Sequence, residues 1–161
     1  MSEPVSPPPL PVTWRPRRGR FVAYGFATLI VVGSVMMAIF IAQPFKLPDR
    51  VALVAFGCAV AFVLHLLGRV RVEADERGVT IVNALRTHRY EWAEILEVTL
   101  VVGDPWPRID FSDGRTIGAM GIQGSEKSRA HRATAELRAL ISERGEAREG
   151  DAPGAGQDRQ G

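Results

Sequence analysis

Cysteine, lysine and histidine are scarce in this chain of 161 residues, and each shortage excludes a class of protein. A single cysteine, Cys58, rules out an internal disulfide framework. Three histidines lie far apart in the sequence, without the ligand spacing of a zinc site. Only two of the 20 basic residues are lysines, and the net charge is +2, so we expect no nucleic-acid partner.

Sequence patterns of catalysis are also missing. The chain contains neither the lysine-bearing phosphate loop, nor the serine motif GxSxG, nor the zinc motif HExxH. Glu91 and Glu94 flank Trp92, but carboxylates on a half-exposed strand usually form a solvated face. The glycine-rich segment 118–124 is interpreted as a plain loop before a helix. We therefore expect a protein that is not an enzyme, with no cofactor, no metal and no small-molecule substrate.

Charged residues are absent from two long apolar segments, Phe21–Ala42 and Val51–Gly68. A bilayer core of about 30 Å is crossed by about 20 helical residues, so both segments are predicted transmembrane helices. The linker Gln43–Arg50 holds two prolines and leaves room only for an antiparallel turn. A cleaved signal sequence is disfavoured because the first segment is too long and a second follows. A buried helix pair is disfavoured because nothing amphipathic elsewhere would cover it.

The charges beside these segments predict their orientation. Four arginines precede the first segment and three follow the second, whereas the linker has two basic residues opposed by one acid. The positive-inside rule then places both termini in the cytoplasm and predicts a multi-pass protein of the inner (plasma) membrane.

Small residues and one histidine stand out inside the spans. We expect the small residues to form the contact between the two helices; they are Gly25, Gly33, Ala55 and Ala59. His65 lies one turn from the interface, where a neutral imidazole would reach headgroups or a neighbouring carbonyl.

The two ends of the chain differ in composition from the rest. Residues 1–20 are predicted to form a disordered Pro/Arg-rich cytoplasmic arm, because six of the 11 prolines fall in 1–16. The arm serves as a spacer or as a ligand for an aromatic groove. Trp14 is predicted to anchor at the headgroups. Residues 145–161 are predicted to be a disordered tail, since they have almost no apolar side chains.

Between the hairpin and the tail, residues 69–144 have the pattern of a small β-rich domain. Alternating apolar residues and turn signals predict six antiparallel strands. These are Val70–Ala74, Val79–Leu85, Thr87–Trp92, Ile95–Val102, Arg108–Ser112 and Arg115–Ile122. The period then changes to that of an amphipathic helix over Ser125–Arg144, which Gly145 would end. This helix is expected to cover the open end of a curved sheet.

Several segments of this domain carry a resemblance. They are the Gly78-Val79 strand entry, the stretch Tyr90–Ile95 with Val98, the Asp113-Gly114 turn and the final helix. With the preceding hairpin, over roughly residues 20–144, they resemble the membrane-anchored bacterial PH-like domain proteins of actinobacteria, the low molecular weight protein antigen 6 PH-domain family. The resemblance implies a PH-type antiparallel β-sandwich or barrel of seven strands with a C-terminal capping helix. It implies no settled activity.

A non-enzymatic interaction or scaffolding module, with an unidentified membrane or cytoplasmic protein as partner, is the function we expect. The alternative is a membrane-tethered sensor of anionic lipid headgroups that uses the basic run Arg86, His88 and Arg89. Many eukaryotic PH domains bind lipid through a basic loop after the first strand; the loop assigned to that place, Asp75–Gly78, is short and acidic. Trp106, between two prolines, either anchors a partner or folds onto the domain.

Overall fold

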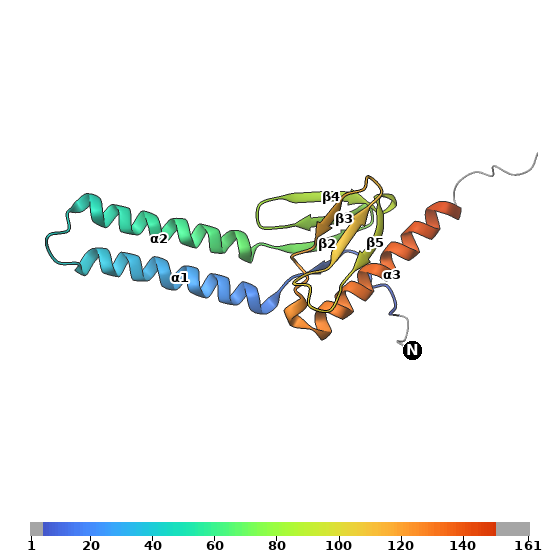
Figure 1. Ribbon diagram of the computed structural model, residues 1–161, viewed down its shortest axis with the longest axis horizontal. Helices are drawn as coiled ribbons and strands as arrows, with labels where there is room; N and C mark the ends of the chain where they lie inside the picture. The colour runs from blue at the N-terminus through green and yellow to red at the C-terminus, as the bar shows by residue number, and fades with distance from the viewer. Residues whose placement is uncertain (1–4, 151–161) are drawn as a thin grey trace, which may run out of the picture.

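The computed structural model describes residues 5–150, with side chains described up to Arg144. Two long helices lie side by side and extend away from a β-rich domain, against which a third helix packs (Figure 1). The two long helices are α1 (Arg17–Phe40) and α2 (Leu47–Gly68), and we call the pair the helical hairpin.

Both helices of the hairpin are long and apolar enough to cross a membrane. Their 24 and 22 residues correspond to roughly 36 and 33 Å of helix. Only 17% and 11% of their most apolar windows are buried within the chain. The domain therefore leaves the hairpin uncovered, which argues against the alternative of a buried helix pair within this chain.

The helices begin earlier than the charge-free segments predict. Pro48 lies in the first turn of α2, where its missing N–H removes no helical hydrogen bond. The Asp49 carboxylate accepts a hydrogen bond from the Lys46 backbone N–H at 2.8 Å. Pro48 thus starts a helix instead of ending one.

The contact between α1 and α2 is built on a glycine that sequence reasoning did not select. Gly57 is buried against Ser34, and a Cβ at this glycine would clash with the serine side chain. The four small residues predicted to form the contact are all exposed, so that prediction is wrong; they are Gly25, Gly33, Ala55 and Ala59. Near the base of the hairpin, His65 Nδ1 lies 3.2 Å from the Tyr24 hydroxyl of α1, so its partner is a side chain of the other helix.

Within residues 5–150, seven antiparallel strands form the domain, in two sheets. The four-stranded sheet, in the order β1-β2-β3-β4, contains β1 (Val12–Trp14), β2 (Arg71–Asp75), β3 (Gly78–Val82) and β4 (Thr87–Glu91). The three-stranded sheet, in the order β5-β6-β7, contains β5 (Ile95–Thr99), β6 (Arg108–Phe111) and β7 (Thr116–Gly118). The antiparallel sandwich that the sequence predicts is confirmed.

The core lies between the two sheets and the helix α3 (Ser128–Gly150). Tyr90 stacks on Phe111 with ring centroids 3.7 Å apart. The apolar stripe predicted for the helix is buried along its whole length, as Ala130, Ala133, Leu137, Leu140 and Ile141. The helix therefore covers the sheets as expected.

Two predictions about the chain ends need correction. The helix α3 does not end at Gly145 but continues to Gly150, because residues with high helix propensity follow that glycine. The rest of the predicted tail, 151–161, lies outside the described residues.

The arm is also not disordered throughout, because Val12–Trp14 forms β1 and pairs with β2 in the register Val12↔Ala74 and Trp14↔Val72. Trp14 is 8% exposed within the core, and its Nε1–H donates to Glu136 at 2.9 Å. The predicted headgroup anchor is therefore a core residue: an indole gains more from burial, and β1 covers an otherwise open edge of β2. The hairpin is thus inserted in the sequence between two neighbouring strands of one sheet.

Candidate functional site

The strand register shows which loops lie beside the hairpin. The strand β2 begins three residues after α2 ends, and its first residue Arg71 pairs with Val82, the last residue of β3. The turn between β3 and β4 therefore lies at the same end of the domain as the hairpin, which we call the hairpin end. The Asn83 side chain in this turn donates to the Gly118 carbonyl at 2.8 Å, so the end of β7 lies there too.

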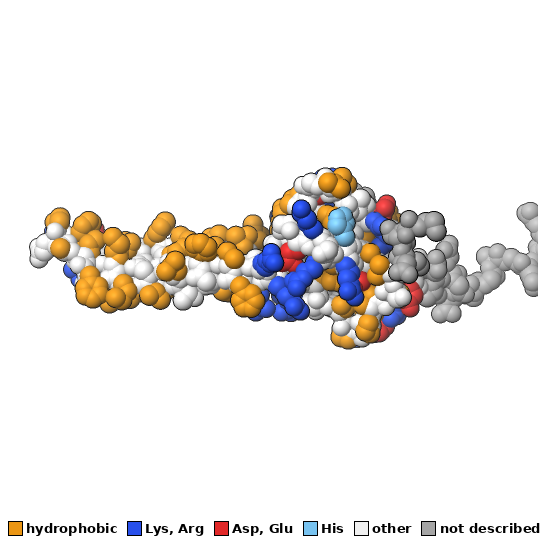
Figure 2. Space-filling view, turned by 90° about the horizontal axis from the view of Figure 1, so that it is seen from below, with side chains coloured by type: hydrophobic (Ala, Val, Ile, Leu, Met, Phe, Trp, Pro, Cys, Tyr) orange, Lys and Arg blue, Asp and Glu red, His pale blue; other side chains and the backbone are white. Residues whose placement is uncertain are grey.

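Basic side chains gather where the helices meet the domain (Figure 2). They come from the connection between β1 and α1, from the first turn of α1, and from the connection between α2 and β2. The arginines of these segments are Arg15, Arg17, Arg18, Arg20, Arg69 and Arg71. The apolar part of α1 starts directly after them, at Phe21. These arginines, which we call the basic band, therefore lie at the base of the hairpin on the face that Figure 2 shows.

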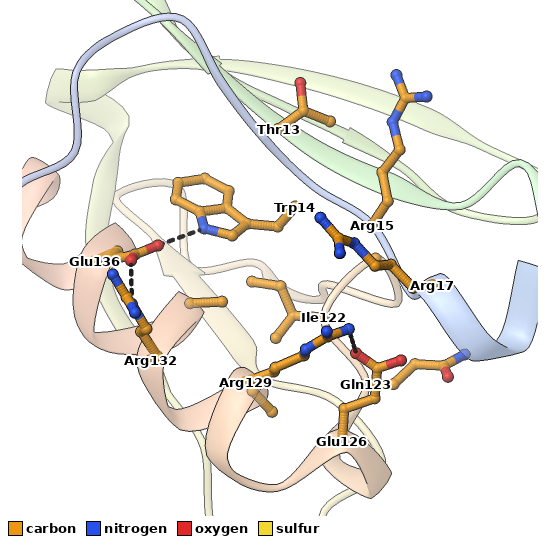
Figure 3. Close-up of a pocket in the computed structure, with 13 residues that line it drawn as sticks. Thr13, Trp14, Arg15, Arg17, Ile122, Gln123, Glu126, Arg129, Arg132 and Glu136 are labelled. Atoms are coloured by element: carbon orange, nitrogen blue, oxygen red, sulfur yellow. Dashed lines mark hydrogen bonds and ion pairs between the residues drawn. The ribbon is translucent and has the colours of Figure 1, made fainter.

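A cavity of about 270 Å³ opens inside this band, between the β1–α1 connection and the first turns of α3 (Figure 3). Four arginines and two glutamates line it, and we call it the arginine hollow. They are Arg15, Arg17, Arg129, Arg132, Glu126 and Glu136. Trp14 and Ile122 add apolar surface. The cations outnumber the anions in this lining, so the hollow favours a negatively charged ligand.

The ion pairs within the hollow leave part of its positive charge unneutralised. Arg132 Nε lies 2.9 Å from Glu136, which also accepts the Trp14 indole N–H, and Arg129 lies 3.7 Å from Glu126. Arg15 lies 3.6 Å from Glu73 on β2, outside the lining. In the part of the chain that the structure describes, Arg17 has neither an ion pair nor a side-chain hydrogen bond. Its guanidinium is therefore available to a ligand.

A second cavity, of about 780 Å³, shares Arg15 and Arg17 with the hollow. It continues along α1 and is also lined by Arg20, Phe21 and Tyr24. Its lining therefore changes from cationic at the domain to aromatic along the helix. Such a lining suits an amphiphile with an anionic head, because guanidinium groups bind phosphate and rings pack against apolar chains.

The predicted basic run does not form one site. Arg86 lies in the β3–β4 turn at the hairpin end, whereas Arg89 lies about 10 Å further along β4 at the usual rise per strand residue. Arg89 pairs with Asp75 at 2.9 Å, and the His88 ring stacks against Tyr90 with centroids 6.3 Å apart. The structure therefore separates these residues and occupies two of them with contacts inside the domain.

Trp106 folds onto the domain, which is the second of its two predicted alternatives. Its side chain is half-buried against Gly118, and a Cβ at that glycine would clash with the indole.

The end of the domain away from the hairpin, which we call the far end, carries carboxylates held by local hydrogen bonds. Burial acts to raise the pKa of Asp75, but hydrogen bonds from the backbone N–H groups of Arg77 and Gly78 and the charge of Arg89 outweigh it and lower that pKa. At the next turn, the Arg115 side chain lowers the pKa of Asp113. The far end therefore keeps its carboxylates ionised, in contrast to the basic hairpin end.

Sequence reasoning did not identify the arginine hollow. The arginines before the first span are predicted from the sequence to orient the hairpin and to face anionic lipid as part of an interfacial anchor, whereas the sequence gives Arg129 and Arg132 no role beyond the polar face of a helix. No local pattern links these two groups, because it is the pairing of β1 with β2 that brings the arm beside α3. The same pairing corrects the assignment of the loop after the first strand: the first strand is β1, and the basic segment and the hairpin come directly after it.

Comparison with known proteins agrees with this fold. Residues 69–140 match the family model described as Bacterial PH domain. The uncharacterized protein Rv1417 of Mycobacterium tuberculosis is 31% identical over 136 residues, which cover 81% of this chain and 88% of the relative. The uncharacterized protein Mb1452 of Mycobacterium bovis matches to the same extent. No solved structure matches the chain. The expected resemblance is thus confirmed, and the chain belongs to the bacterial PH domain family.

Proposed function

We propose that this chain is an integral protein of the plasma membrane that crosses the bilayer twice, with both termini and the PH-like domain on the cytoplasmic side. The length and apolar surface of α1 and α2 support the crossing. The basic band lies at the domain end of the hairpin, whereas the opposite connection carries Lys46 and Arg50 against Asp49. The positive-inside rule accounts for this distribution.

On that side, the PH-like domain is a non-enzymatic interaction module whose ligand is the anionic headgroup of a phospholipid. The observation that carries this proposal is the arginine hollow, which opens beside the point where α1 becomes apolar. A headgroup at that depth lies within reach of Arg15 and Arg17, and its acyl chains run along Phe21. Each arginine near an anionic leaflet contributes about 1 kcal/mol, so several acting together favour anionic over zwitterionic lipid.

Headgroup binding in the arginine hollow is tested by native mass spectrometry, which counts the phospholipids that the full chain retains after gentle detergent extraction. Membranes contain phosphatidylglycerol and phosphatidylcholine in equal amounts. We expect preferential retention of phosphatidylglycerol, and loss of this preference in Arg129→Gln/Arg132→Gln. These two arginines lie on α3, so the charges that orient the hairpin stay unchanged.

The matched control is Arg89→Gln/Arg115→Gln, which removes two exposed, ion-paired arginines of the far end. We expect the control to keep the preference. An unchanged preference in the α3 variant, or an equal loss in both variants, contradicts binding in the hollow. The variant Arg86→Gln/Arg89→Gln tests the alternative that the basic run Arg86, His88 and Arg89 binds the lipid; loss of the preference in this variant and not in the α3 variant would favour that alternative.

Topology is tested separately with the single cysteine replaced, in Cys58→Ser. A cysteine in the connection between the helices, Phe45→Cys, should react with an impermeant maleimide added outside intact cells. A cysteine in the domain, Val102→Cys, should react only after permeabilisation. The reverse pattern would place the domain outside and refute the orientation.

Docking of a protein partner is the second candidate function, supported by the open edge of β4. In the described part of the chain this strand pairs with β3 alone, so its outer edge is available to an added strand. A photo-crosslinking residue at Arg89, on this edge, should give a discrete protein adduct in intact cells that the same residue at Val102 does not give. Identical adducts from both positions would contradict docking on this edge.

A further inference from the structure

The β3–β4 turn carries an apolar side chain that the fold does not use. Leu85 is 84% exposed, and it stands between Ala84 and the exposed Arg86. A single exposed leucine is common on protein surfaces. Leu85 differs from such residues in its position beside the base of the hairpin.

The strand register places the turn at the depth where α2 ends. Since Arg71 pairs with Val82, continuing the two strands by two residues brings Ala84 level with Arg69, next to the last helical residue Gly68. The turn that precedes β4 also reaches alongside the end of α2 in the ribbon view (Figure 1). Leu85 therefore lies at the level at which the hairpin changes from apolar to charged.

The turn is held in place by hydrogen bonds from both the backbone and the side chain of Asn83. The Asn83 backbone N–H donates to the Arg86 carbonyl at 2.9 Å. The Asn83 side chain donates to the Gly118 carbonyl at 2.8 Å and accepts from the Met120 N–H at 3.2 Å. These bonds join the turn to the second sheet, so Leu85 is presented from a rigid support.

Charge around the turn complements an anionic leaflet. Among the described residues, the Arg86 side chain has no ion pair, and the basic band with Arg69 lies at the same end of the domain. The carboxylates Asp75 and Asp113 lie at the far end. Those beside the basic band are ion-paired: Glu73 with Arg15 and Arg71, and Glu126 with Arg129. The hairpin end is therefore apolar and basic together, which is the combination found where proteins contact lipid surfaces.

We infer that the β3–β4 turn inserts Leu85 into the interface of the leaflet from which α1 and α2 emerge, with Arg86 against the phosphate layer. This gives the domain a contact with the lipid surface that is independent of the hairpin. It fixes the tilt of the domain and thereby the direction in which β4 and the far end point. The inference rests on the proposed crossing of the membrane by the hairpin.

The test uses the full chain with Cys58→Ser and one new cysteine labelled with an environment-sensitive nitrobenzoxadiazole dye. Leu85→Cys is compared with Leu96→Cys, which replaces an exposed leucine near the start of β5, toward the far end. The chains are reconstituted in vesicles of phosphatidylglycerol and phosphatidylcholine. At position 85 we expect a shift of emission to shorter wavelength, quenching by nitroxide-labelled lipid and loss of quenching by aqueous iodide. The label at position 96 should be quenched by aqueous iodide, should not be quenched by nitroxide-labelled lipid and should show no shift of emission.

Equal iodide quenching at 85 and 96 would overturn the inference. So would protection from iodide at 85 without quenching by nitroxide lipid, because a protein surface, such as a second copy, would then cover the turn. A third label at Phe26, in the apolar part of α1, separates the two proposals. If nitroxide lipid quenches the label at position 26 but not the label at position 85, the turn does not insert, while the proposed crossing by the hairpin stands. If 26 is not quenched, the proposed crossing fails, and the inference fails with it.

Discussion

At the scale of single residues, Trp14 connects parts of the chain that are far apart in sequence. Its indole fills the core beside β2, and its N–H reaches Glu136 on α3, which in turn holds Arg132 at the arginine hollow. One side chain of the arm thus contributes both to the core and to the position of a lining residue of the hollow. A position before the helical hairpin therefore affects the stability of a domain that follows it.

Trp14→Ala should lower the free energy of unfolding of the domain by about 3–5 kcal/mol, the usual cost of removing a buried tryptophan side chain. Denaturant unfolding of the full chain in detergent, followed by near-ultraviolet circular dichroism, measures this loss. Glu136→Gln is the control, because an amide oxygen still accepts the indole N–H and the core keeps its volume. If Trp14→Ala lowers the free energy of unfolding by less than Glu136→Gln does, β1 does not stabilise the domain.

The lowered pKa of Asp75 predicts how the stability of the domain depends on pH. This pKa is lowered in the folded chain, so the folded state binds the proton less readily than the unfolded state, whose pKa is about 3.9. The stabilisation is fully present above that value and is lost as the pH falls through the folded pKa. Because the side chain is 43% exposed, Asp75→Asn should cost under about 1 kcal/mol at pH 7.

This difference in the free energy of unfolding between Asp75→Asn and the unchanged chain should be smaller at pH 3 than at pH 7, because pH 3 lies below the unfolded pKa. Denaturant midpoints at pH 7, 5 and 3 measure it. A difference that stays the same at all three pH values would mean that the carboxylate charge is not what stabilises the turn.

At the scale of elements, sequence patterns predict those helices and strands whose formation depends on residues close together in the sequence. The two spans follow from the absence of charge, and six strands and the long helix follow from apolar periods of two and 3.6. The strand β1 was not predictable in this way, because three residues within a proline-rich arm show no period, and their pairing depends on the distant β2. Likewise, Gly57 was missed because helix contacts depend on how the helices rotate against each other, which the sequences of the separate spans do not specify.

The contact of α1 with α2 gives a prediction at this scale. Gly57→Ala places a methyl group against Ser34 and should destabilise the hairpin by about 1–3 kcal/mol, as overpacking does. Adding Ser34→Gly should restore stability by making room. Gly33→Ala, on an open face, should have no effect.

Helical circular dichroism during thermal unfolding in detergent compares these three variants with the unchanged chain. Equal loss in Gly33→Ala and Gly57→Ala would show that the two helices do not pack through this contact.

At the scale of the whole molecule, the hairpin is an insertion in a sheet, and the domain is joined to it at both ends. The β1–α1 and α2–β2 connections leave from neighbouring strands, so the domain has little freedom to rotate about the hairpin. The arginine hollow and the β3–β4 turn are held at the base of the helices for this reason. A domain on a single flexible linker would not keep either of them at a fixed depth.

This arrangement predicts how a soluble domain is obtained. Trp14 and Val72 face each other in the sheet, so a short turn suffices to join β1 to β2. Replacing Pro16–Val70 with Asn-Gly keeps this register and should give a folded domain, whereas residues 69–150 alone should fold poorly because β2 has an open edge and the core lacks Trp14.

Amide nuclear magnetic resonance spectra of the two chains provide the measurement. Dispersed signals are expected for the chain that keeps β1 and collapsed signals for the one that lacks it. Well-dispersed spectra of both would show that the domain is complete without the arm.

The place of β1 before the hairpin also has a consequence for biosynthesis. On the proposed topology, β1 is synthesised before α1 and α2, so it stays unpaired until both helices have entered the bilayer and β2 has been made. Pairing then succeeds only if the chain has returned to the side from which it started. If only α1 crosses, β1 and β2 lie on opposite sides of the bilayer, so the sheet stays incomplete. On this topology, completion of the sheet therefore requires that both helices have crossed the bilayer.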